Sequence, residues 1–219
     1  MDKESSLQRI LRTGIVAILR ADDGSRLADA AEALAEGGVD IVEVTFTVPR
    51  AEKVLAEVAE RLGDRVLLGA GTILDTETAR VALMSGARFL VSPVVRPSVI
   101  ELARRYAVPV FPGAFTPTEV LTAWEAGADV VKVFPSDAVG PGYLKVLRGP
   151  LPQVRLMPTG GVNLQTIGDF LRAGACAVGV GSSLVEPQAL AAGDFARMQS
   201  LARQYIKAVA ETREQLAKK

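Results

Sequence analysis

Short apolar runs alternate with amphipathic segments along almost the whole chain. The apolar runs are rich in Val, Ile and Leu and show little polar alternation, as is typical of parallel strands buried on both faces. Eight runs are expected to form strands: Ile15–Leu19, Val39–Val44, Val66–Leu68, Arg88–Val91, Val108–Phe111, Val130–Val133, Val154–Met157 and Ala177–Val180.

The segments between these runs carry apolar residues at helical spacing. Helices are expected at Ser5–Arg12, Ser25–Glu36, Ala51–Leu62, Thr76–Ser85, Pro97–Tyr106, Thr118–Glu125, Gly142–Leu147 and Gln165–Arg172. A long C-terminal helical region is expected from about Asp194. The chain therefore reads as strand–helix units in series, preceded by one extra helix and followed by a helical extension.

A weak internal repeat supports this order. The phrases EGGVDIVEV, SGARFLVS, EAGADVVKV and RAGACAVGV recur at intervals of roughly 45 residues, and in each a glycine joins a helix end to a strand. A doubly wound open sheet is the alternative, but eight similar units favour a closed (β/α)8 TIM barrel. We expect residues 1–219 to form one such domain, with an extra N-terminal helix and a C-terminal helical extension.

The composition excludes several classes of chemistry. Lys plus Arg and Asp plus Glu are each 25, so no overall charge favours nucleic acid or an anionic membrane. The absence of histidine excludes Ser-His pairs and His-based zinc sites. The single cysteine, Cys176, excludes a disulfide framework and fits a reducing compartment. Residues 1–12 lack the apolar core of a signal peptide, and a cytoplasmic location is expected.

One lysine, Lys132, interrupts the apolar strand in GADVVKVFP. Burial disfavours the ammonium form, so a lysine held in a buried strand should have a lowered pKa and more free amine at neutral pH. A free amine attacks ketones. The alternative is a strand-end lysine whose stem packs on apolar surface while its ammonium group reaches water.

In a barrel, chemistry belongs to the carboxyl ends of the strands. Reactive, polar and glycine residues gather at these predicted ends: Arg20, Glu43, Thr45, Thr72, Ser92, Pro93, Pro112, Gly113, Lys132, Thr159, Gly160, Gly161, Gly181 and Ser182. Because so many strand ends carry such residues, their convergence on one mouth is a stronger signal than any single residue.

Glu43 is a carboxylate inside a second apolar strand, IVEVTF. An unpaired buried carboxylate is costly, so a partner or a raised pKa is expected. Across the mouth from Lys132 it can transfer protons. The alternative is a structural ion pair, for which Arg20 is the competing cation.

Two glycine-rich loops follow the last two strands, MPTGGV at 157–162 and GVGSS at 179–183. Glycine lets the backbone approach an anion with its N–H groups exposed, and a short helix after the second loop would add its positive end. Barrel phosphate sites form from these two loops. Two tight turns without a ligand are the structural alternative.

With these residues in place, the chain resembles the class I family of 2-keto-3-deoxy-6-phosphogluconate (KDPG) and 4-hydroxy-2-oxoglutarate (KHG) aldolases. The resemblance runs from about Thr13 to Val185 and rests on EVTFTVP, GAGT, FLVSP, FPGAFTPTE, VVKVFPS, MPTGGV and VGVGSSL. It implies that Lys132 forms the Schiff base and that Glu43 is the acid–base residue. It also implies a homotrimer.

The resemblance further implies a substrate site. Thr72 would hold the pyruvyl part, and Thr159 would influence which stereoisomer fits. The substrate phosphate would be held by Gly160, Gly161, Gly181 and Ser182. Pro93, in the FLVSP segment, is also expected to line the site.

One position departs from the family pattern. Many members carry a substrate-binding arginine four residues beyond the catalytic glutamate, where this chain has Thr47. Thr47 is still expected to be one of the substrate-binding residues. Arg20, at the end of the first strand, is our candidate for the missing cation.

The expected reaction is cleavage of KDPG to pyruvate and glyceraldehyde 3-phosphate, without a metal or cofactor. KHG, or the 6-phosphogalactonate epimer of KDPG, is the alternative substrate within the family, although PTGG at 158–161 resembles the phosphogluconate branch more. A barrel isomerase or epimerase using Glu43 as its base, and a non-catalytic sugar-phosphate binder, are more distant alternatives.

Overall fold

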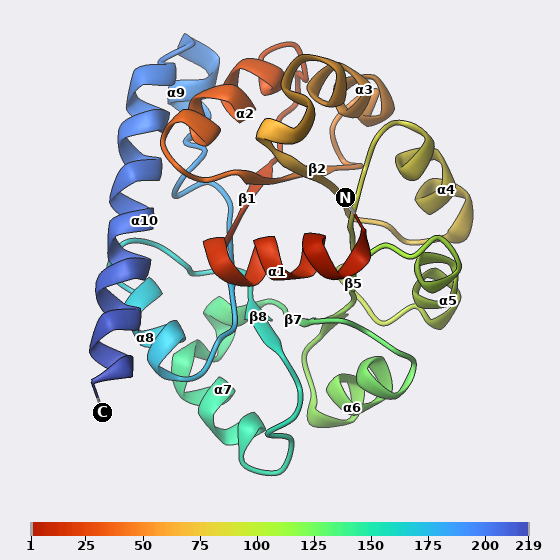
Figure 1. Ribbon diagram of the computed structural model, residues 1–219, viewed down its shortest axis with the longest axis vertical. Coiled ribbons are helices and arrows are strands. Elements are labelled where there is room, and N and C mark those ends of the chain that lie inside the picture. Colours follow the sequence, from red (N-terminus) through yellow and green to blue (C-terminus); the bar gives the residue numbers. More distant parts are fainter. Residues whose placement is uncertain (1, 219) are drawn as a thin grey trace.

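Parallel strands alternate with helices in the computed structural model, which describes residues 2–218 (Figure 1). The strands are β1 (Ile15–Leu19), β2 (Ile41–Thr45), β3 (Leu67–Gly71), β4 (Leu90–Val91), β5 (Val110–Phe111), β6 (Gly113–Ala114), β7 (Val131–Val133), β8 (Leu156–Pro158) and β9 (Val178–Val180). The helices are α1 (Lys3–Thr13), α2 (Leu27–Glu36), α3 (Ala51–Leu62), α4 (Thr76–Met84), α5 (Pro97–Arg105), α6 (Pro117–Glu125), α7 (Gly140–Arg148), α8 (Ile167–Arg172), α9 (Pro187–Ala192) and α10 (Phe195–Ala217).

The strands pair in parallel as two curled sheets. The larger has the order β5-β4-β3-β2-β1-β9, and the smaller has the order β6-β7-β8. Helices α2 to α8 lie around the outside of the strands, and α10 runs along one side (Figure 1). The predicted α/β architecture with parallel strands is therefore confirmed.

The predicted fifth strand, Val108–Phe111, is wrong in its bounds. The chain there forms two short strands, β5 and β6, separated by Pro112. Proline has no N–H to donate to a neighbouring strand, but its carbonyl accepts a hydrogen bond from the Lys132 N–H at 2.9 Å. The chain therefore passes from one sheet to the other at this point. Pairing thus divides the strands into sheets of six and three, where eight strands were predicted to form one closed sheet.

Local sequence signals set several helix ends. The carboxylate of Asp2 accepts a hydrogen bond from the Ser5 N–H at the start of α1, and Gly14 ends that helix with φ 75°. A capping box between Thr116 and Glu119 starts α6. The predicted extension begins as expected, because Asp194 caps α10.

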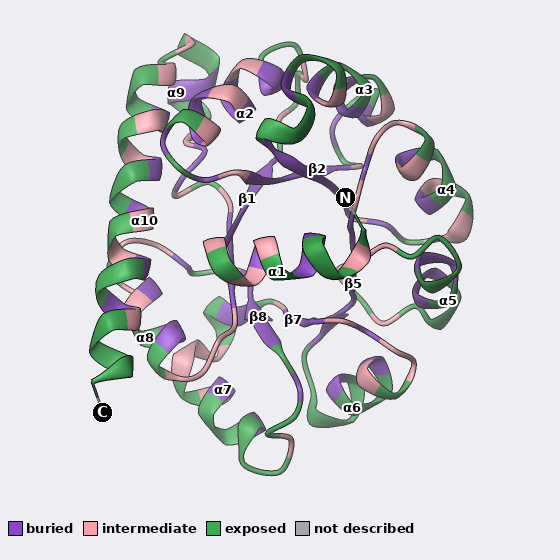
Figure 2. Ribbon diagram, viewed as in Figure 1, coloured by how far each residue is buried: buried purple, intermediate pink, exposed green. Residues whose placement is uncertain are grey.

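The core has two parts, separated by the strands. The larger lies between the strands and the surrounding helices, whose inward sides are buried (Figure 2). The smaller, which we call the inner cluster, lies on the side of the curled strands away from the surrounding helices and consists of Leu7, Ile10, Val16, Ile41, Leu67, Phe89, Val91, Phe111, Val130, Met157 and Ala177. Burial of these side chains supplies most of the driving force for folding.

Helix α1 crosses the amino-terminal end of the strands (Figure 1). Its Leu7 and Ile10 side chains belong to the inner cluster. Arg9 pairs with Asp40, just before β2, at 2.7 Å, and Lys3 pairs with Asp129, just before β7, at 2.8 Å. The extra N-terminal helix therefore covers the amino-terminal ends of the strands, which leaves their carboxyl ends for a binding site.

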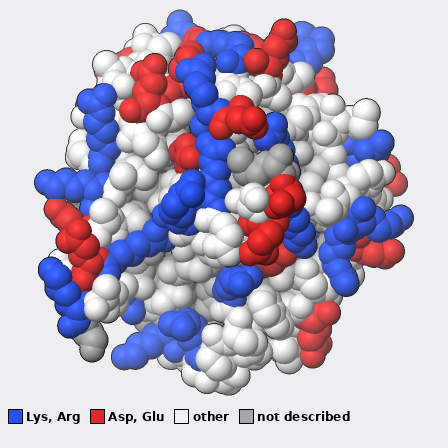
Figure 3. Space-filling model, viewed as in Figure 1, with Lys and Arg blue, Asp and Glu red and all other residues white. Residues whose placement is uncertain are grey.

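The surface on the α1 side carries mixed charge. Figure 3 shows basic and acidic side chains interspersed across this face. Within residues 2–218, every helix is too short or too polar to cross a bilayer.

Candidate active site

Lys132 lies in the middle of β7, beside Gly113 of β6 and Met157 of β8. The residue is 6% exposed. Burial lowers the pKa of its ammonium group, the Glu43 carboxylate opposes that shift, and the Arg20 guanidinium adds to it. Its Nζ lies 5.0 Å from the centre of the Phe134 ring. The alternative reading, a stem-packed lysine with its ammonium in water, does not describe this side chain.

Glu43 lies in the middle of β2, between Ile18 of β1 and Gly69 of β3. Its residue is 1% exposed, and burial raises the pKa of the carboxyl group, against the opposing effects of Lys132 and Arg20. Within residues 2–218, Oε2 has no hydrogen-bond partner. The carboxylate packs over Gly71, where a β-carbon would overlap Oε1.

Glu43 and Lys132 act on each other through space. Each opposes the shift that burial imposes on the other's pKa. In the described part of the chain, no salt bridge joins Glu43 to Lys132 or to Arg20. Within the described residues the structural ion pair considered for Glu43 is therefore not formed, and the carboxyl group and the amine are both buried.

Arg20 follows β1 directly and is exposed. Thr47, at the position of the family arginine, is also exposed, and its Oγ1 lies 2.8 Å from Oγ1 of the buried Thr45. Thr45 Oγ1 also donates to the carbonyl of Leu19 at 3.3 Å. These bonds connect the end of β2 to Leu19 at the end of β1, the residue before Arg20.

The two glycine-rich loops enclose a cavity of about 290 Å³, which we call the loop cavity. Arg20, Thr159, Gly160, Gly161, Gly181 and Ser182 all contribute to its wall. The Ser183 hydroxyl donates to the Val162 carbonyl at 2.7 Å and so joins the two loops. The short helix expected after the second loop is α9, which begins at Pro187.

The backbone of the first loop requires glycine. Gly160 and Gly161 have φ values of 98° and 68°, which residues with a β-carbon rarely adopt. Gly181 differs, because a β-carbon there would meet no described atom within 4 Å. Gly181 is also one of the residues that line the loop cavity.

Thr159 is a buried residue of the cavity wall, 6% exposed, and its Oγ1 has no hydrogen-bond partner within residues 2–218. Thr72 follows β3 directly and has φ 60°, unusual for a β-branched residue. Pro93 follows β4, with its carbonyl packed against Gly113.

The predicted site residues divide into two groups. Arg20, Thr159 and the loop residues line the loop cavity, whereas Lys132, Glu43, Thr47, Thr72 and Pro93 lie outside its wall. Phe134 connects the groups, because it lines the cavity and its ring lies beside the Lys132 amine.

Sequence reasoning missed three contributors. In the sequence Phe134 is one more apolar residue of the strand that contains Lys132, and nothing there shows that its ring lies beside the Lys132 amine. Ser136 is fully buried and bonded to Thr159, and Asp137 packs against Gly160 and Gly161. The VVKVFPS segment contained the first two residues but carried no signal of their partners.

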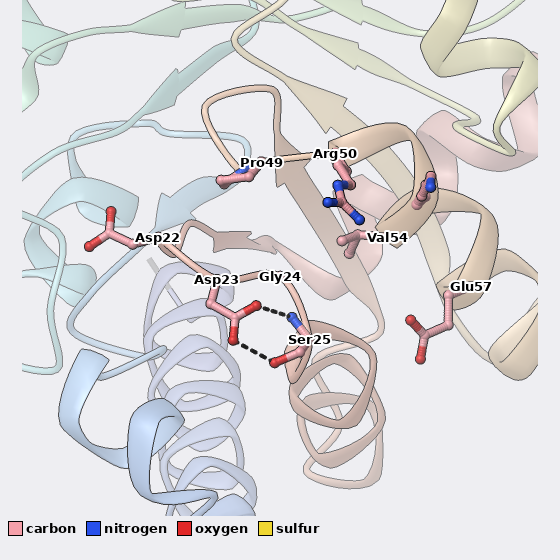
Figure 4. Close-up of a pocket in the computed structure, with 9 residues that line it drawn as sticks. Asp22, Asp23, Gly24, Ser25, Pro49, Arg50, Val54 and Glu57 are labelled. Atoms are coloured by element: carbon pink, nitrogen blue, oxygen red, sulfur yellow. Dashed lines mark hydrogen bonds between the residues drawn. The ribbon is translucent and has the colours of Figure 1, made fainter.

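Two further hollows lie near the residues that follow β1. One, of about 710 Å³, shares Arg20 and Pro187 with the loop cavity. The other, of about 410 Å³, lies between the residues after β1 and the start of α3 (Figure 4). There both carboxylate oxygens of Asp23 accept hydrogen bonds from Ser25. Neither hollow contains Lys132 or Glu43.

Within residues 2–218, no three Asp, Glu or Cys side chains converge to form a set of metal ligands. The sequence has no histidine. The expectation of a reaction without metal or cofactor stays a prediction.

Most of the chain, including these motifs, is similar to known aldolases. The family model described as KDPG and KHG aldolase matches residues 7–201. The 2-dehydro-3-deoxy-phosphogluconate aldolase of Treponema pallidum is 36% identical over 208 residues, which cover 93% of this chain and 96% of the relative. The 2-dehydro-3-deoxy-6-phosphogalactonate aldolase of Escherichia coli is 35% identical over 171 residues, or 78% and 83% of the two chains.

A solved structure gives the same result. KDPG aldolase from Legionella pneumophila, with pyruvate captured as a covalent carbinolamine, has a TM-score of 0.84 and 27% identity, and the match covers 90% of this chain and 96% of that one. The matched region contains Lys132, Glu43 and both glycine-rich loops. This chain belongs to the KDPG and KHG aldolase family.

Proposed function

We propose that this protein is a class I aldolase that cleaves KDPG to pyruvate and glyceraldehyde 3-phosphate. Lys132 carries the proposal, because it is an amine buried at 6% exposure with a lowered pKa. A neutral amine adds to a ketone, and the resulting iminium accepts electrons. The carbinolamine described for the Legionella relative supports the same chemistry here.

The first steps build the iminium. The neutral Nζ of Lys132 attacks the C2 carbonyl carbon. The hydroxyl of the resulting carbinolamine takes up a proton and leaves as water, which gives a protonated imine. Glu43 takes the proton from the C4 hydroxyl, directly or through a water. The C3–C4 bond then breaks, its electron pair moves into the imine to form an enamine, and glyceraldehyde 3-phosphate leaves.

The remaining steps release pyruvate. Glu43 returns the proton to C3 of the enamine, which restores the iminium. Water adds to C2, and the C2–N bond breaks to free pyruvate and the lysine amine. The raised pKa of Glu43 suits both directions of transfer, since a carboxyl group whose pKa lies nearer neutrality both accepts and donates protons efficiently.

We assign the phosphate end and the pyruvyl end of the substrate to different site residues. We assign the phosphate to the loop cavity, where Gly160, Gly161, Gly181 and Ser182 present backbone groups and space. Arg20 would supply a cation beside that cavity, in place of the arginine absent at Thr47. Thr72 and Pro93, at the ends of β3 and β4, would contact the pyruvyl part.

The 6-phosphogalactonate epimer is the second candidate substrate. The Escherichia coli relative that acts on it is 35% identical, close to the 36% of the Treponema pallidum relative named for phosphogluconate. The two epimers differ at C4. The Thr159 hydroxyl in the cavity wall, which bonds to no other described residue, is our candidate for distinguishing them.

We also infer that residues 1–219 form one domain, a closed (β/α)8 barrel in which β5 and β6 make one interrupted strand. A parallel bridge between Thr159 and Gly179 supports closure on the other side, between β8 and β9. The inner cluster also supports it, since its members come from strands of both sheets.

We further propose a cytoplasmic homotrimer. Exposed apolar side chains on and beside α4 support association, because monomeric proteins seldom expose such groups together. Leu74, Val81, Met84 and Val94 are 43%, 45%, 69% and 46% exposed. Sedimentation at micromolar concentration tests the trimer.

One experiment separates the aldolase from its rivals. The protein is incubated with pyruvate and borohydride, digested, and the added mass is located. An adduct on Lys132 is expected, whereas an isomerase or a sugar-phosphate binder gives none. Cleavage rates of KDPG, its galactonate epimer and KHG then assign the substrate.

A further inference from the structure

Ser136 is a fully buried serine between β7 and the first glycine-rich loop. Its hydroxyl donates to the Val133 carbonyl at 2.6 Å and accepts from the Thr159 N–H at 3.0 Å. Its own N–H donates to the Thr159 carbonyl at 2.9 Å. Ser136 therefore forms hydrogen bonds with the carbonyl of Val133, the residue after Lys132, and with both the N–H and the carbonyl of Thr159.

The backbone does not depend on this hydroxyl for satisfied hydrogen bonds. The Thr159 N–H also donates directly to the Val133 carbonyl at 3.0 Å. If the Ser136 hydroxyl were removed, both groups would keep a partner, so no buried polar group would be orphaned. The direct hydrogen bond between Thr159 and Val133 already pairs these two backbone groups, and the Ser136 hydroxyl adds a second connection between β7 and the loop.

The residues after Ser136 support the loop by packing. A β-carbon at Gly160 would lie 3.1 Å from Oδ1 of Asp137 and 3.3 Å from the Ser136 nitrogen. At Gly161 it would lie 2.9 Å from the β-carbon of Asp137. The two glycines thus rest directly on the 136–137 backbone, and a shift of that backbone moves the loop.

We propose that Ser136 is a positioning residue that holds Thr159 and the Gly160–Gly161 loop in register with Lys132. The proposal rests on the proposed aldolase function. Ser136 touches neither the reacting carbons nor the amine. It sets the distance between the imine and the groups that hold the rest of the substrate, and so governs binding of the phosphorylated end and discrimination at C4.

The test compares Ser136→Ala with the unaltered enzyme in three assays. KM for KDPG should rise about fivefold with kcat changed less than twofold, as expected for loss of one neutral hydrogen bond. The ratio of kcat/KM for KDPG to that for the galactonate epimer should fall. Borohydride trapping of pyruvate should keep its rate, because the Lys132 N–H remains bonded to Pro112.

Ser6→Ala is the matched control. Its hydroxyl is also buried, 2% exposed, and donates to the Asp2 carbonyl at 2.9 Å, at the opposite end of the strands. This variant should leave KM and the epimer ratio unchanged. Ser136→Cys, which fills the volume with a weaker donor, should change both in the same direction as Ser136→Ala and serves if the alanine variant does not fold.

Wild-type KM and epimer ratio in folded Ser136 variants would overturn the proposal. A matching loss of pyruvate trapping would also overturn it, because Ser136 would then act on the lysine itself. Failure of the unaltered enzyme to trap pyruvate would instead reject the aldolase function, so the two failures are distinguishable.

Discussion

The carboxylate of Glu43 occupies the space above Gly71 that any larger residue would need for its β-carbon. Gly71 ends β3 with a φ outside the left-handed region, so close approach of the carboxylate, and no backbone requirement, explains the glycine. The absence of a side chain at one residue thereby fixes the place of the proposed proton-transfer group on the next strand.

Gly71→Ala should lower kcat for cleavage by about tenfold to a hundredfold, since displacing a catalytic group by about 1 Å costs that much. Pyruvate trapping on Lys132 should continue. A double-mutant cycle with Glu43→Ala isolates the cause. With the carboxylate already removed, Gly71→Ala should cost little more, and a full additional loss would contradict the explanation.

Gly181→Ala should raise KM for KDPG by roughly tenfold, because the new methyl group enters the space assigned to phosphate. KM for KHG, which has no phosphate, should stay within twofold. Gly142→Ala is the matched control, since a β-carbon there also meets no described atom within 4 Å but lies on exposed α7. Equal effects on both substrates would argue against a phosphate site.

Arg20→Ala should raise KM for anionic substrates about tenfold or more, because the loop cavity would lose the cation in its wall. Arg12→Ala removes an exposed arginine on α1, at the covered end of the strands, and should leave KM unchanged. An unchanged KM in Arg20→Ala would remove the case that Arg20 replaces the arginine missing at Thr47.

The pH dependence of pyruvate trapping should report the lowered pKa of Lys132. Only the neutral amine reacts, so the trapping rate rises with pH through a midpoint below the ordinary lysine value. Glu43→Gln removes an anion that raises the pKa and should shift the midpoint to lower pH. Arg20→Met removes a cation that lowers it and should shift the midpoint to higher pH. Shifts in the same direction would contradict the electrostatic description.

Both buried groups should reduce stability at neutral pH. Lys132 has a lowered pKa, so its contribution to folding grows as pH rises from the folded to the unfolded value and is complete only above the latter. Glu43 has a raised pKa, so its contribution is complete below the unfolded value and is lost as pH rises through the folded value. Near pH 7 the fold therefore holds two groups that would be better solvated in the unfolded chain.

The double variant Glu43→Gln with Lys132→Met should raise the free energy of unfolding by roughly 1 to 3 kcal/mol at pH 7, while abolishing activity. Urea unfolding measures the change. Glu211→Gln with Lys207→Met makes the same chemical change at an exposed pair 3.8 Å apart and should alter stability by less than about 0.5 kcal/mol. A less stable active-site variant would contradict the cost assigned to burial.

Local signals predicted much of the fold. The strand Ile15–Leu19 and the helix Ala51–Leu62 were predicted to the residue, because apolar runs and helical periodicity are properties of the segment itself. The break at Pro112 was not predicted. It depends on which neighbour each side of the proline pairs with, and that is a property of the assembled sheets.

The site residues likewise include some that the sequence predicts and some that only the assembled structure reveals. Lys132 and Glu43 stood out because a charge inside an apolar strand is unusual in any context. Ser136 did not, since a serine after a strand has no distinctive neighbours in sequence and its partner Thr159 is 23 residues away. Phe134 likewise becomes a candidate site residue only when the structure places its ring beside the Lys132 amine.

Helix α1 has a kinetic consequence for the proposed enzyme. Because Leu7 and Ile10 pack on the inner cluster at the amino-terminal ends of the strands, keto acid, water and both products would share the opening at the carboxyl ends. The imine keeps pyruvate attached until water reaches C2, so glyceraldehyde 3-phosphate departs first, through the same opening by which that water enters. Steady-state inhibition should show pyruvate competing with KDPG and the aldehyde binding only to the imine-bearing enzyme, since the end that α1 covers offers neither product a second exit.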